Sequence, residues 1–245
     1  MPDTDKAGQS HFLHGIFTAV PPRYDIINHL MTGGMDRRWR TLAARECLAG
    51  KPRRFLDLCC GTGDLSLAVA GMGGDGVEVF GIDYSQPMLA KAAQKAMALG
   101  DGNKPVFIPG DISSIPFPEG HFDAVGISFA FRNITYKNPL ADKYLAEVSR
   151  VLKPGGRFVI VESSQPRRSP AIVRWLHHFY VGQVVYRLGW LISRDKKSYG
   201  YLAESVVNYY SPEELKDILK AAGFGRVSFR RLFLGAAAIH VAVKC

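Results

Sequence analysis

The chain has 245 residues, which is enough for one large α/β domain or two small ones. Hydrophobic residues make up 47% of it and charged residues 22%, and these values exclude a disordered or low-complexity protein. The formal net charge of +9 is unevenly placed, because residues 150–245 hold 16 Lys and Arg against 6 Asp and Glu. A basic half attracts phosphate groups, whether of nucleic acid or of an anionic membrane surface, so charge alone leaves both partners open.

The cysteines and the apolar segments indicate the compartment. The four Cys residues form no C-x-x-C pair, so we expect reduced thiols in a cytoplasmic protein and no metal site. The first ten residues are polar and predict no signal peptide. The stretch Ala171–Ile192 is the most membrane-like, but polar side chains such as Arg174 and Arg187 interrupt it. We therefore expect it to lie on a bilayer surface at most, not to cross one.

Strand-like and helix-like segments alternate along the chain. Short apolar runs rich in Val, Ile and Phe are typical of buried parallel strands. They predict strands at Arg54–Cys59, Val77–Ile82, Pro105–Ile108, Phe122–Phe129 and Arg157–Val161. Helices are predicted between them at Leu65–Ala70, Gln86–Leu99 and Ala141–Leu152, and a Lys153-Pro154-Gly155-Gly156 turn stops the last one.

The C-terminal part predicts one more helix and a strand pair. Ser211-Pro212-Glu213-Glu214 has the pattern of a helix start, and the helix is expected to run to a C-cap at Gly223. Strands at Val227–Phe233 and Ala236–Val243 are joined too closely for a crossover helix, so they are antiparallel. The order of the predicted helices and strands indicates a single domain (1–245). Its sheet is expected to be doubly wound and mostly parallel, with an antiparallel strand at or near one edge.

Two segments fall outside this alternation. Residues 1–45 are predicted to form an N-terminal helical cap, and residues 166–210 a helical insertion. Ligands of doubly wound sheets bind beyond the carboxyl ends of the strands. We therefore expect both segments to cover that rim.

A glycine-bearing loop follows the first predicted strand. Asp57 begins a D-x-x-x-G-x-G-D pattern in which Gly61 and Gly63 permit a tight turn and a close approach of the backbone to a ligand. A dinucleotide site would favour Gly or Ala at the position of Ser66. The loop therefore resembles that of S-adenosylmethionine (SAM) methyltransferases, which holds a methionine tail; the alternative is a purely structural turn.

Two further carboxylates follow at successive strand ends. Asp83, with Tyr84 beside it, ends the second strand, where a carboxylate can accept hydrogen bonds from ribose hydroxyls. The alternative role of Asp83 is a helix N-cap. Asp111 follows the third strand and can accept from an adenine amino group while Ile112 packs on the ring; the alternative is a solvated loop residue. Three such features in this order predict a SAM pocket.

Nearly the whole chain resembles the ubiquinone/menaquinone-biosynthesis C-methyltransferases. The matching segments are Arg23–Arg40, Leu56–Leu65, Pro116–Asn133, Arg150–Pro166 and Ser198–Val206. The first and the last two lie outside the generic SAM core or extend it. The pair Cys59-Cys60 leans to the menaquinone branch, because the ubiquinone branch tends to have Ala-Gly there. Tyr136 departs from the family, which often has Asp at that position.

The resemblance implies a Rossmann-like, seven-stranded class I methyltransferase fold and SAM as methyl donor. It implies that the donor contacts Thr62, Asp83, Asp111, Ile112 and Ser128, and that Tyr24, Arg132 and Asn133 line the reacting ring. The ring would belong to a polyprenylated quinol methylated on carbon, with demethylmenaquinol to menaquinol as first choice. The ubiquinone-branch benzoquinol, another small-molecule methyl acceptor and a non-catalytic SAM-binding scaffold stay open.

Carbon methylation requires an ionised ring hydroxyl. Arg132 is a fixed cation that can stabilise the phenolate, and a water held by Tyr24, Arg132 and Asn133 can accept the proton. The alternative for Arg132 is a helix-end or surface ion pair. The seven histidines include no residue that we favour as a base.

The polyprenyl tail of the implied substrate is apolar, so the protein is expected to collect this substrate from a membrane. Trp175, Phe179 and Trp190, interleaved with Arg168 and Arg174, suit an interfacial helix or a tail-binding tunnel; the plain alternative is a helix packed over the active site. We expect peripheral contact with the inner face of an anionic membrane. The sequence leaves open whether the protein forms a homodimer or joins a quinone-biosynthesis assembly. Nucleic acid is not expected, because Phe131-Arg132-Asn133 stands where amino-directed base methyltransferases carry a D/N-P-P-Y motif.

Overall fold

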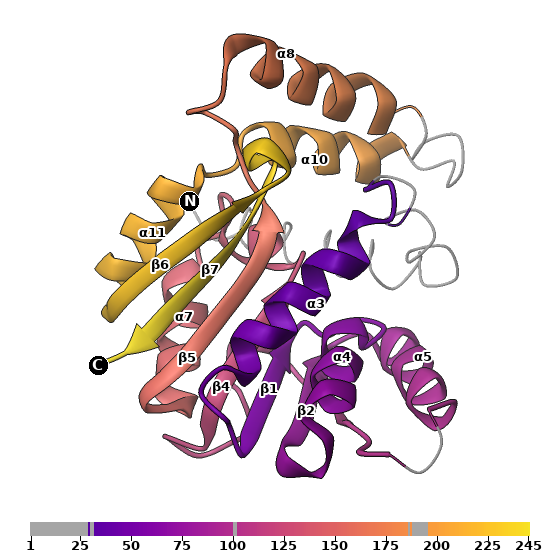
Figure 1. Ribbon diagram of the computed structural model, residues 1–245, viewed down its shortest axis with the longest axis vertical. Helices are drawn as coiled ribbons and strands as arrows, with labels where there is room; N and C mark the ends of the chain where they lie inside the picture. Colours follow the sequence, from indigo (N-terminus) through magenta and orange to yellow (C-terminus); the bar gives the residue numbers. More distant parts are fainter. Residues whose placement is uncertain (1–28, 30–31, 100–101, 186, 188–195) are drawn as a thin grey trace, which may run out of the picture.

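The computed structural model of the chain describes residues 29, 32–99, 102–185, 187 and 196–245. Its centre is a seven-stranded sheet in the order β3-β2-β1-β4-β5-β7-β6 (Figure 1). The strands are β1 (Arg54–Leu58), β2 (Glu78–Asp83), β3 (Val106–Pro109), β4 (Phe122–Ser128), β5 (Leu152–Ser163), β6 (Phe224–Leu232) and β7 (Ala237–Lys244).

Pairing confirms the predicted doubly wound, mostly parallel sheet. β1 pairs in parallel with β2 on one side and β4 on the other, and β2–β3 and β4–β5 are parallel too. β7 runs antiparallel to both β5 and β6, so the antiparallel strand stands second from the edge. The short η3 turn (Phe233–Gly235) joins β6 to β7, which leaves no room for a crossover helix.

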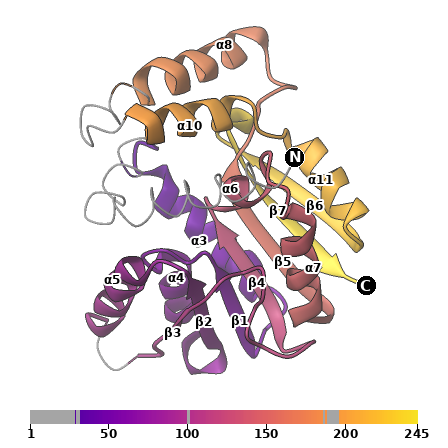
Figure 2. The ribbon, with the colours of Figure 1, turned by 180° about the vertical axis from the view of Figure 1, so that it is seen from behind.

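Helices cover both faces of the sheet (Figures 1 and 2). One face carries α3 (Met35–Leu48) and α4 (Asp64–Gly73), with α5 (Gln86–Met97) beside them. The other face carries α7 (Ala141–Val151) and α11 (Pro212–Ala221). The remaining helical segments are η1 (Gly74–Gly76), α6 (Phe131–Thr135), α8 (Ala171–Phe179), the π-helix η2 (Tyr180–Val185) and α10 (Lys196–Val207).

Burial explains why the central strands read as continuous apolar runs. Phe55, Leu56 and Leu58 of β1 are fully buried, since one face of the strand packs under α3 and α4 and the other under the cluster around α7 and α11. Strands buried on both faces need apolar side chains at every position. This makes Asp57, in the middle of β1, an exception that requires a reason.

Several predicted boundaries differ from the structure by a few residues, and two of these differences occur at glycines. Strand β5 begins at Leu152, five residues earlier than predicted, because the glycine turn is absorbed as an irregularity in its pairing with β4. Gly155 there has φ +75°. Helix α11 ends at Ala221 with Ala222 as C-cap, and Gly223, predicted as the cap, is the next residue, with φ +92°.

The strand order reverses between β1 and β4, and this is where ligands of such sheets bind. α8 and α10 lie beyond the carboxyl end of β5 (Figure 1), whereas α3 packs along the face of the sheet. Most of the predicted cap over 1–45 falls outside the described residues. Within the part of the chain that is described, no helix has both the length and the apolar character to span a bilayer.

Candidate active site

The predicted donor-binding residues gather at one edge of the sheet. Gly61 follows β1, Asp83 ends β2, Asp111 follows β3 and Ser128 ends β4. The strand pairing places these ends side by side, with Leu58 opposite both Ile82 and Ile127. Adjacent carboxyl ends of parallel strands therefore bring together residues that lie up to 67 positions apart in the chain.

The two loop glycines are needed for different reasons. Gly61 has φ +55°, and a Cβ there would meet no atom within 4 Å, so its backbone faces open space. Gly63 has φ +80°, and a Cβ would lie 2.8 Å from Cζ of Phe107 and 2.9 Å from Cβ of Ala92. Gly61 thus leaves room for a ligand to approach the main chain, while Gly63 lets α4 and α5 pack closely.

Asp83 fastens this loop to the neighbouring strand. Its Oδ2 accepts a hydrogen bond from the Gly61 amide at 2.9 Å and its Oδ1 one from the Ser85 amide at 2.8 Å. Ser85, not Asp83, occupies the N-cap position of α5. Burial raises the pKa of Asp83, and the amide hydrogen bonds oppose that shift. The amides that oppose the shift are those of Ser85, Gly61 and Tyr84. A carboxylate has about four acceptor sites, so Asp83 can still accept from a ribose hydroxyl.

Asp57 is the buried carboxyl beneath the loop. Its Oδ2 accepts from the amide of Ser66 at 3.0 Å and from its hydroxyl at 2.6 Å. Its buried Oδ1 has no hydrogen-bond partner among the described residues. Burial raises the pKa of Asp57 to about 7, although Ser66 opposes this. A buried acceptor such as Oδ1 of Asp57 lowers the stability of the fold unless a ligand or a water molecule donates a hydrogen bond to it.

The backbone is strained where β1 and β4 end. Cys59 follows β1 with φ +48° and Phe129 follows β4 with φ +56°, a region that residues with a Cβ rarely occupy. These two positions flank the point where the strand order reverses. Backbone strain of this kind collects at functional sites, so the strain points to the same crevice as the glycine loop.

The other predicted donor contacts have partners within the protein. Thr62 is buried, and its Oγ1 accepts from Nζ of Lys95 at 2.8 Å. Asp111 is exposed and its Oδ1 accepts from the Ser113 amide at 2.7 Å, while the neighbouring Ile112 is buried. Tyr84 and Ser128 are half-buried beside the same strand ends.

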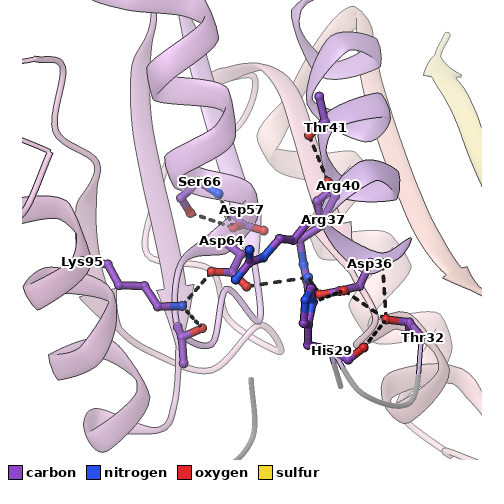
Figure 3. Close-up of polar contacts among 11 residues, drawn as sticks. His29, Thr32, Asp36, Arg37, Arg40, Thr41, Asp57, Asp64, Ser66 and Lys95 are labelled. Atoms are coloured by element: carbon purple, nitrogen blue, oxygen red, sulfur yellow. Dashed lines mark hydrogen bonds and ion pairs between the residues drawn. The ribbon is translucent and has the colours of Figure 1, made fainter. Parts of the chain in front are cut away.

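A polar cluster lies beside the glycine loop on the side of α3 (Figure 3). Nη1 of Arg40 lies 2.5 Å from Oδ2 of Asp36 and 3.6 Å from Oδ2 of Asp64, which directly follows the glycine loop. The Cζ atom of Arg40 stands 5.1 Å from the ring centroid of Phe129. Lys95 holds Asp64 from the opposite side at 2.7 Å.

Arg132, predicted to face the reacting ring, is buried rather than part of a surface ion pair. Its Nη1 donates to Oγ of Ser205 on α10, and its Nε lies 4.0 Å from Oε1 of Glu162 at the end of β5. The amide of Arg132 donates to Oε2 of the same glutamate at 3.0 Å. Its Nε has no hydrogen-bond partner in the described part of the chain. The guanidinium is therefore fixed in place, and its Nε–H can still donate a hydrogen bond to a ligand.

The neighbours of Arg132 include residues that sequence reasoning missed. Glu162 and Ser205 lie in segments that carried the family resemblance, but no motif pairs them with Arg132. Tyr201 packs near them; burial raises its pKa and the charge of Arg132 opposes this. A lone carboxylate in an apolar strand was the available signal for Glu162. Asn133 is buried next to Arg132, and Tyr24 lies outside the described residues.

A pocket between α8 and the end of α10 is separate from the predicted donor site. Gln165, Arg174, Trp175 and His178 line it, together with none of the predicted donor-binding residues. Its lining mixes polar side chains with Trp175 and Val207, so it has no continuous apolar wall for an isoprenoid tail. No group of three or more His, Cys, Asp or Glu side chains able to hold a metal ion occurs in the described ranges.

A solved structure with the same architecture defines the class. A SAM-dependent methyltransferase from Aquifex aeolicus superimposes with a TM-score of 0.55 at 21% identity, covering 82% of this chain and 88% of its own. At this identity the likeness shows the fold alone, which is that of the class I SAM-dependent methyltransferases. The predicted fold class is confirmed.

Sequence comparison gives the family. The model of the ubiE/COQ5 methyltransferase family matches residues 4–244, so the chain belongs to that family and is a SAM-dependent C-methyltransferase. A demethylmenaquinone methyltransferase of Thermus thermophilus is 42% identical over 92% of this chain and 98% of its own length. A ubiquinone/menaquinone biosynthesis C-methyltransferase of Cereibacter sphaeroides is 36% identical, covering 98% of this chain and 92% of its own.

Proposed function

We propose that this protein methylates a ring carbon of a polyprenylated quinol, with demethylmenaquinol as substrate and SAM as donor. The observation that carries the proposal is Arg132, a buried guanidinium four residues beyond Ser128, where β4 ends beside the point at which the strand order reverses. The names of the relatives in Thermus thermophilus and Cereibacter sphaeroides support a quinone-type acceptor. Cys59-Cys60 favours the naphthoquinol over the benzoquinol.

We assign each part of the donor to residues at the strand ends. Asp83 would hold the ribose, Asp111 and Ile112 the adenine, and Gly61, Thr62 and Gly63 the methionine tail, with Asp57, Tyr84 and Ser128 around them. The open space at Gly61 and the unpaired Oδ1 of Asp57 are the features that suit a cationic ligand there. When bound, SAM supplies a methyl group made electrophilic by the sulfonium.

The acceptor needs an electron-rich ring carbon. A ring hydroxyl ionises near pH 10 in water, so the site must stabilise the phenolate that forms when a water, held by Tyr24, Arg132 and Asn133, takes the proton. Glu162 partly neutralises Arg132, so the stabilisation comes from directed N–H groups rather than from net charge. Ser205 and Glu162 fix these groups before the quinol binds.

The substrate is identified by a paired assay. Purified protein is incubated with isotopically labelled SAM and either a demethylated naphthoquinol or a demethylated benzoquinol of equal tail length, and product mass is measured. We expect the labelled methyl on the naphthoquinol with the higher kcat/KM. A preference for the benzoquinol would reassign the branch, and no methylated quinol in either reaction would refute the proposal.

Replacing Arg132 tests the mechanism. Arg132→Lys keeps the charge but loses the planar fork, and Arg132→Met with Glu162→Gln removes the pair without leaving a buried carboxylate alone. We expect kcat to fall about 100-fold or more in the double variant and the Kd for SAM to stay nearly constant. Glu162→Gln alone is the control; full turnover in the double variant would remove Arg132 from the mechanism.

We further propose that the protein touches an anionic membrane, from which it collects the quinol. The contact would use an apolar patch, which consists of Ile172, Trp175, Leu176 and Phe179 of α8 and Phe233 and Leu234 of η3. All six side chains are at least half exposed, from 50% to 68%. Oγ of Ser169, two residues before α8 begins, donates to the carbonyl of Leu234 at 2.6 Å and so links the start of α8 to η3.

The surroundings of the apolar patch suit lipid headgroups. Arg168 and Arg174 flank it and are exposed, although Glu213 pairs with Arg168 at 3.1 Å. Phe233 and Leu234 adopt φ of +41° and +55°, a strained turn that presents two apolar side chains to the outside. Since the apolar side chains of α8 and η3 are exposed and do not line an enclosed cavity among the described residues, these features favour an interfacial helix over a tail-binding tunnel.

A further inference from the structure

We infer that Arg40 binds the carboxylate of the methionine part of SAM and is thus a specificity-determining residue of the donor site. The inference takes the donor from the family and concerns only which side chain recognises its carboxylate. Arg40 lies outside the glycine loop and outside every strand end, on α3, and no sequence motif assigned it a role.

Arg40 contacts the segments that follow β4 and β1, at the point where the strand order reverses. Its guanidinium contacts the ring of Phe129, which follows β4, and its Nη1 lies 3.6 Å from Asp64, which follows the glycine loop after β1. Figure 3 shows the side chain reaching from α3 toward Asp57 and Asp64. A donor whose methionine tail lay on the glycine loop would bring its carboxylate close to this arginine.

The guanidinium has donors left for a ligand. The side chain of Arg40 is 9% exposed, yet its buried Nε has no hydrogen-bond partner among the described residues, and its hydrogen bond to Asp36 uses Nη1. A guanidinium offers five N–H donors in a fork that matches a carboxylate. An unsatisfied donor at this depth is costly, and a bound carboxylate would satisfy it.

Charge explains why the carboxylate needs this cation. Asp36 and Asp64 lie beside Arg40, and their negative charges suit the ammonium and sulfonium of the donor but repel its carboxylate. Lys95, the other cation close by, is held by Thr62 and Asp64. Arg40 is the cation of this cluster that still offers buried donors.

Arg40 is also preorganised. Burial by itself raises the pKa of Asp36, but hydrogen bonds from His29 and Thr32 and the charge of Arg40 outweigh it, so the pKa of Asp36 is lowered. The carboxylate thus stays ionised and holds Nη1 of Arg40 in place at 2.5 Å. A side chain already ordered before the ligand binds loses less entropy on binding.

A ligand that lacks only the carboxylate separates recognition from structural support. We would measure Kd by calorimetry for SAM, S-adenosylhomocysteine and decarboxylated SAM with wild type and with Arg40→Met. We expect wild type to bind SAM about 10- to 100-fold more tightly than decarboxylated SAM. Arg40→Met should lose that preference, weakening SAM and S-adenosylhomocysteine while leaving decarboxylated SAM nearly unchanged.

The controls keep the inference testable if the single variant folds poorly. Asp36→Asn with Arg40→Met removes both charges of the buried pair, Arg40→Lys keeps the charge and should recover part of the preference, and Arg38→Ala removes an exposed arginine from the same helix. Equal weakening of all three ligands, or no change in any, would overturn the inference, as would a wild type that binds SAM and decarboxylated SAM alike. A wild type that binds no SAM would instead refute the donor assignment.

Discussion

Asp57 shows how one residue couples the site to pH. In the unfolded chain its carboxyl ionises near pH 3.8, whereas burial raises its pKa to about 7 in the folded protein. Between these values the folded state holds a proton that the unfolded state has lost. The stability that this carboxyl contributes is therefore complete below the unfolded pKa and is lost as pH rises through the folded one.

This predicts a measurable pH slope. The free energy of unfolding of the ligand-free protein should fall by about 1 kcal/mol per pH unit between pH 5 and pH 7 through Asp57. Asp57→Asn keeps an acceptor for Ser66 and should lose that slope, as followed by urea denaturation. Asp75→Asn, at an exposed position, is the control. An unchanged slope in Asp57→Asn would contradict the assignment.

At the scale of elements, α11 shows a helix start that the sequence specifies completely. Ser211 is the N-cap, its Oγ accepts from the amide of Glu214, and the Glu214 side chain accepts from the amide of Ser211 at 2.8 Å. This reciprocal pair satisfies two N–H groups that the helix itself leaves open. The helix in turn packs Leu215 and Leu219 on the sheet.

Removing the cap should weaken the whole domain. Ser211→Ala is expected to lower the free energy of unfolding by about 1 kcal/mol, because the partly buried amide of Glu214 loses its acceptor. Denaturant titration measures this, with Ser228→Ala in an exposed strand position as the matched control. Equal effects of the two changes would show that the capping hydrogen bond contributes nothing.

Helix α8 is the opposite case, an element that the rest of the described chain leaves uncovered. None of its residues is buried, although it carries Trp175 and Phe179 with their rings stacked 5.6 Å apart. The sequence alone left a packed helix and an interfacial helix both open. The exposure of its residues in the folded structure favours the interfacial helix.

At the scale of the whole molecule, the apolar patch predicts how the protein meets a bilayer. Trp175→Glu with Phe233→Glu should abolish co-sedimentation with anionic vesicles, because burial of both side chains drives the contact. Met97→Glu is the matched control, since Met97 is 74% exposed on α5, outside the patch. Turnover of a short-tailed, water-soluble quinol should stay unchanged. Equal binding to neutral and anionic vesicles would contradict the role of the arginines.

The arrangement of the elements followed from local patterns along the chain. The apolar runs that predicted strands lie within the observed β1 to β7 apart from a few end residues, because buried parallel strands leave a continuous apolar pattern. The predicted boundaries were wrong where local turn residues favour one structure and strand pairing favours another. The turn before Arg157 reads as a helix stop, but pairing with β4 extends β5 back to Leu152.

The sequence by itself determined the order of the strands along the chain, the glycine loop and the carboxylates at successive strand ends, because each of these is a local pattern. Only the tertiary structure decided which residues complete the site. Arg40 reaches Asp64 from 24 positions away and Arg132 meets Ser205 from 73 positions away. Such pairs depend on how helices pack across the sheet edge, and no local spacing encodes that contact.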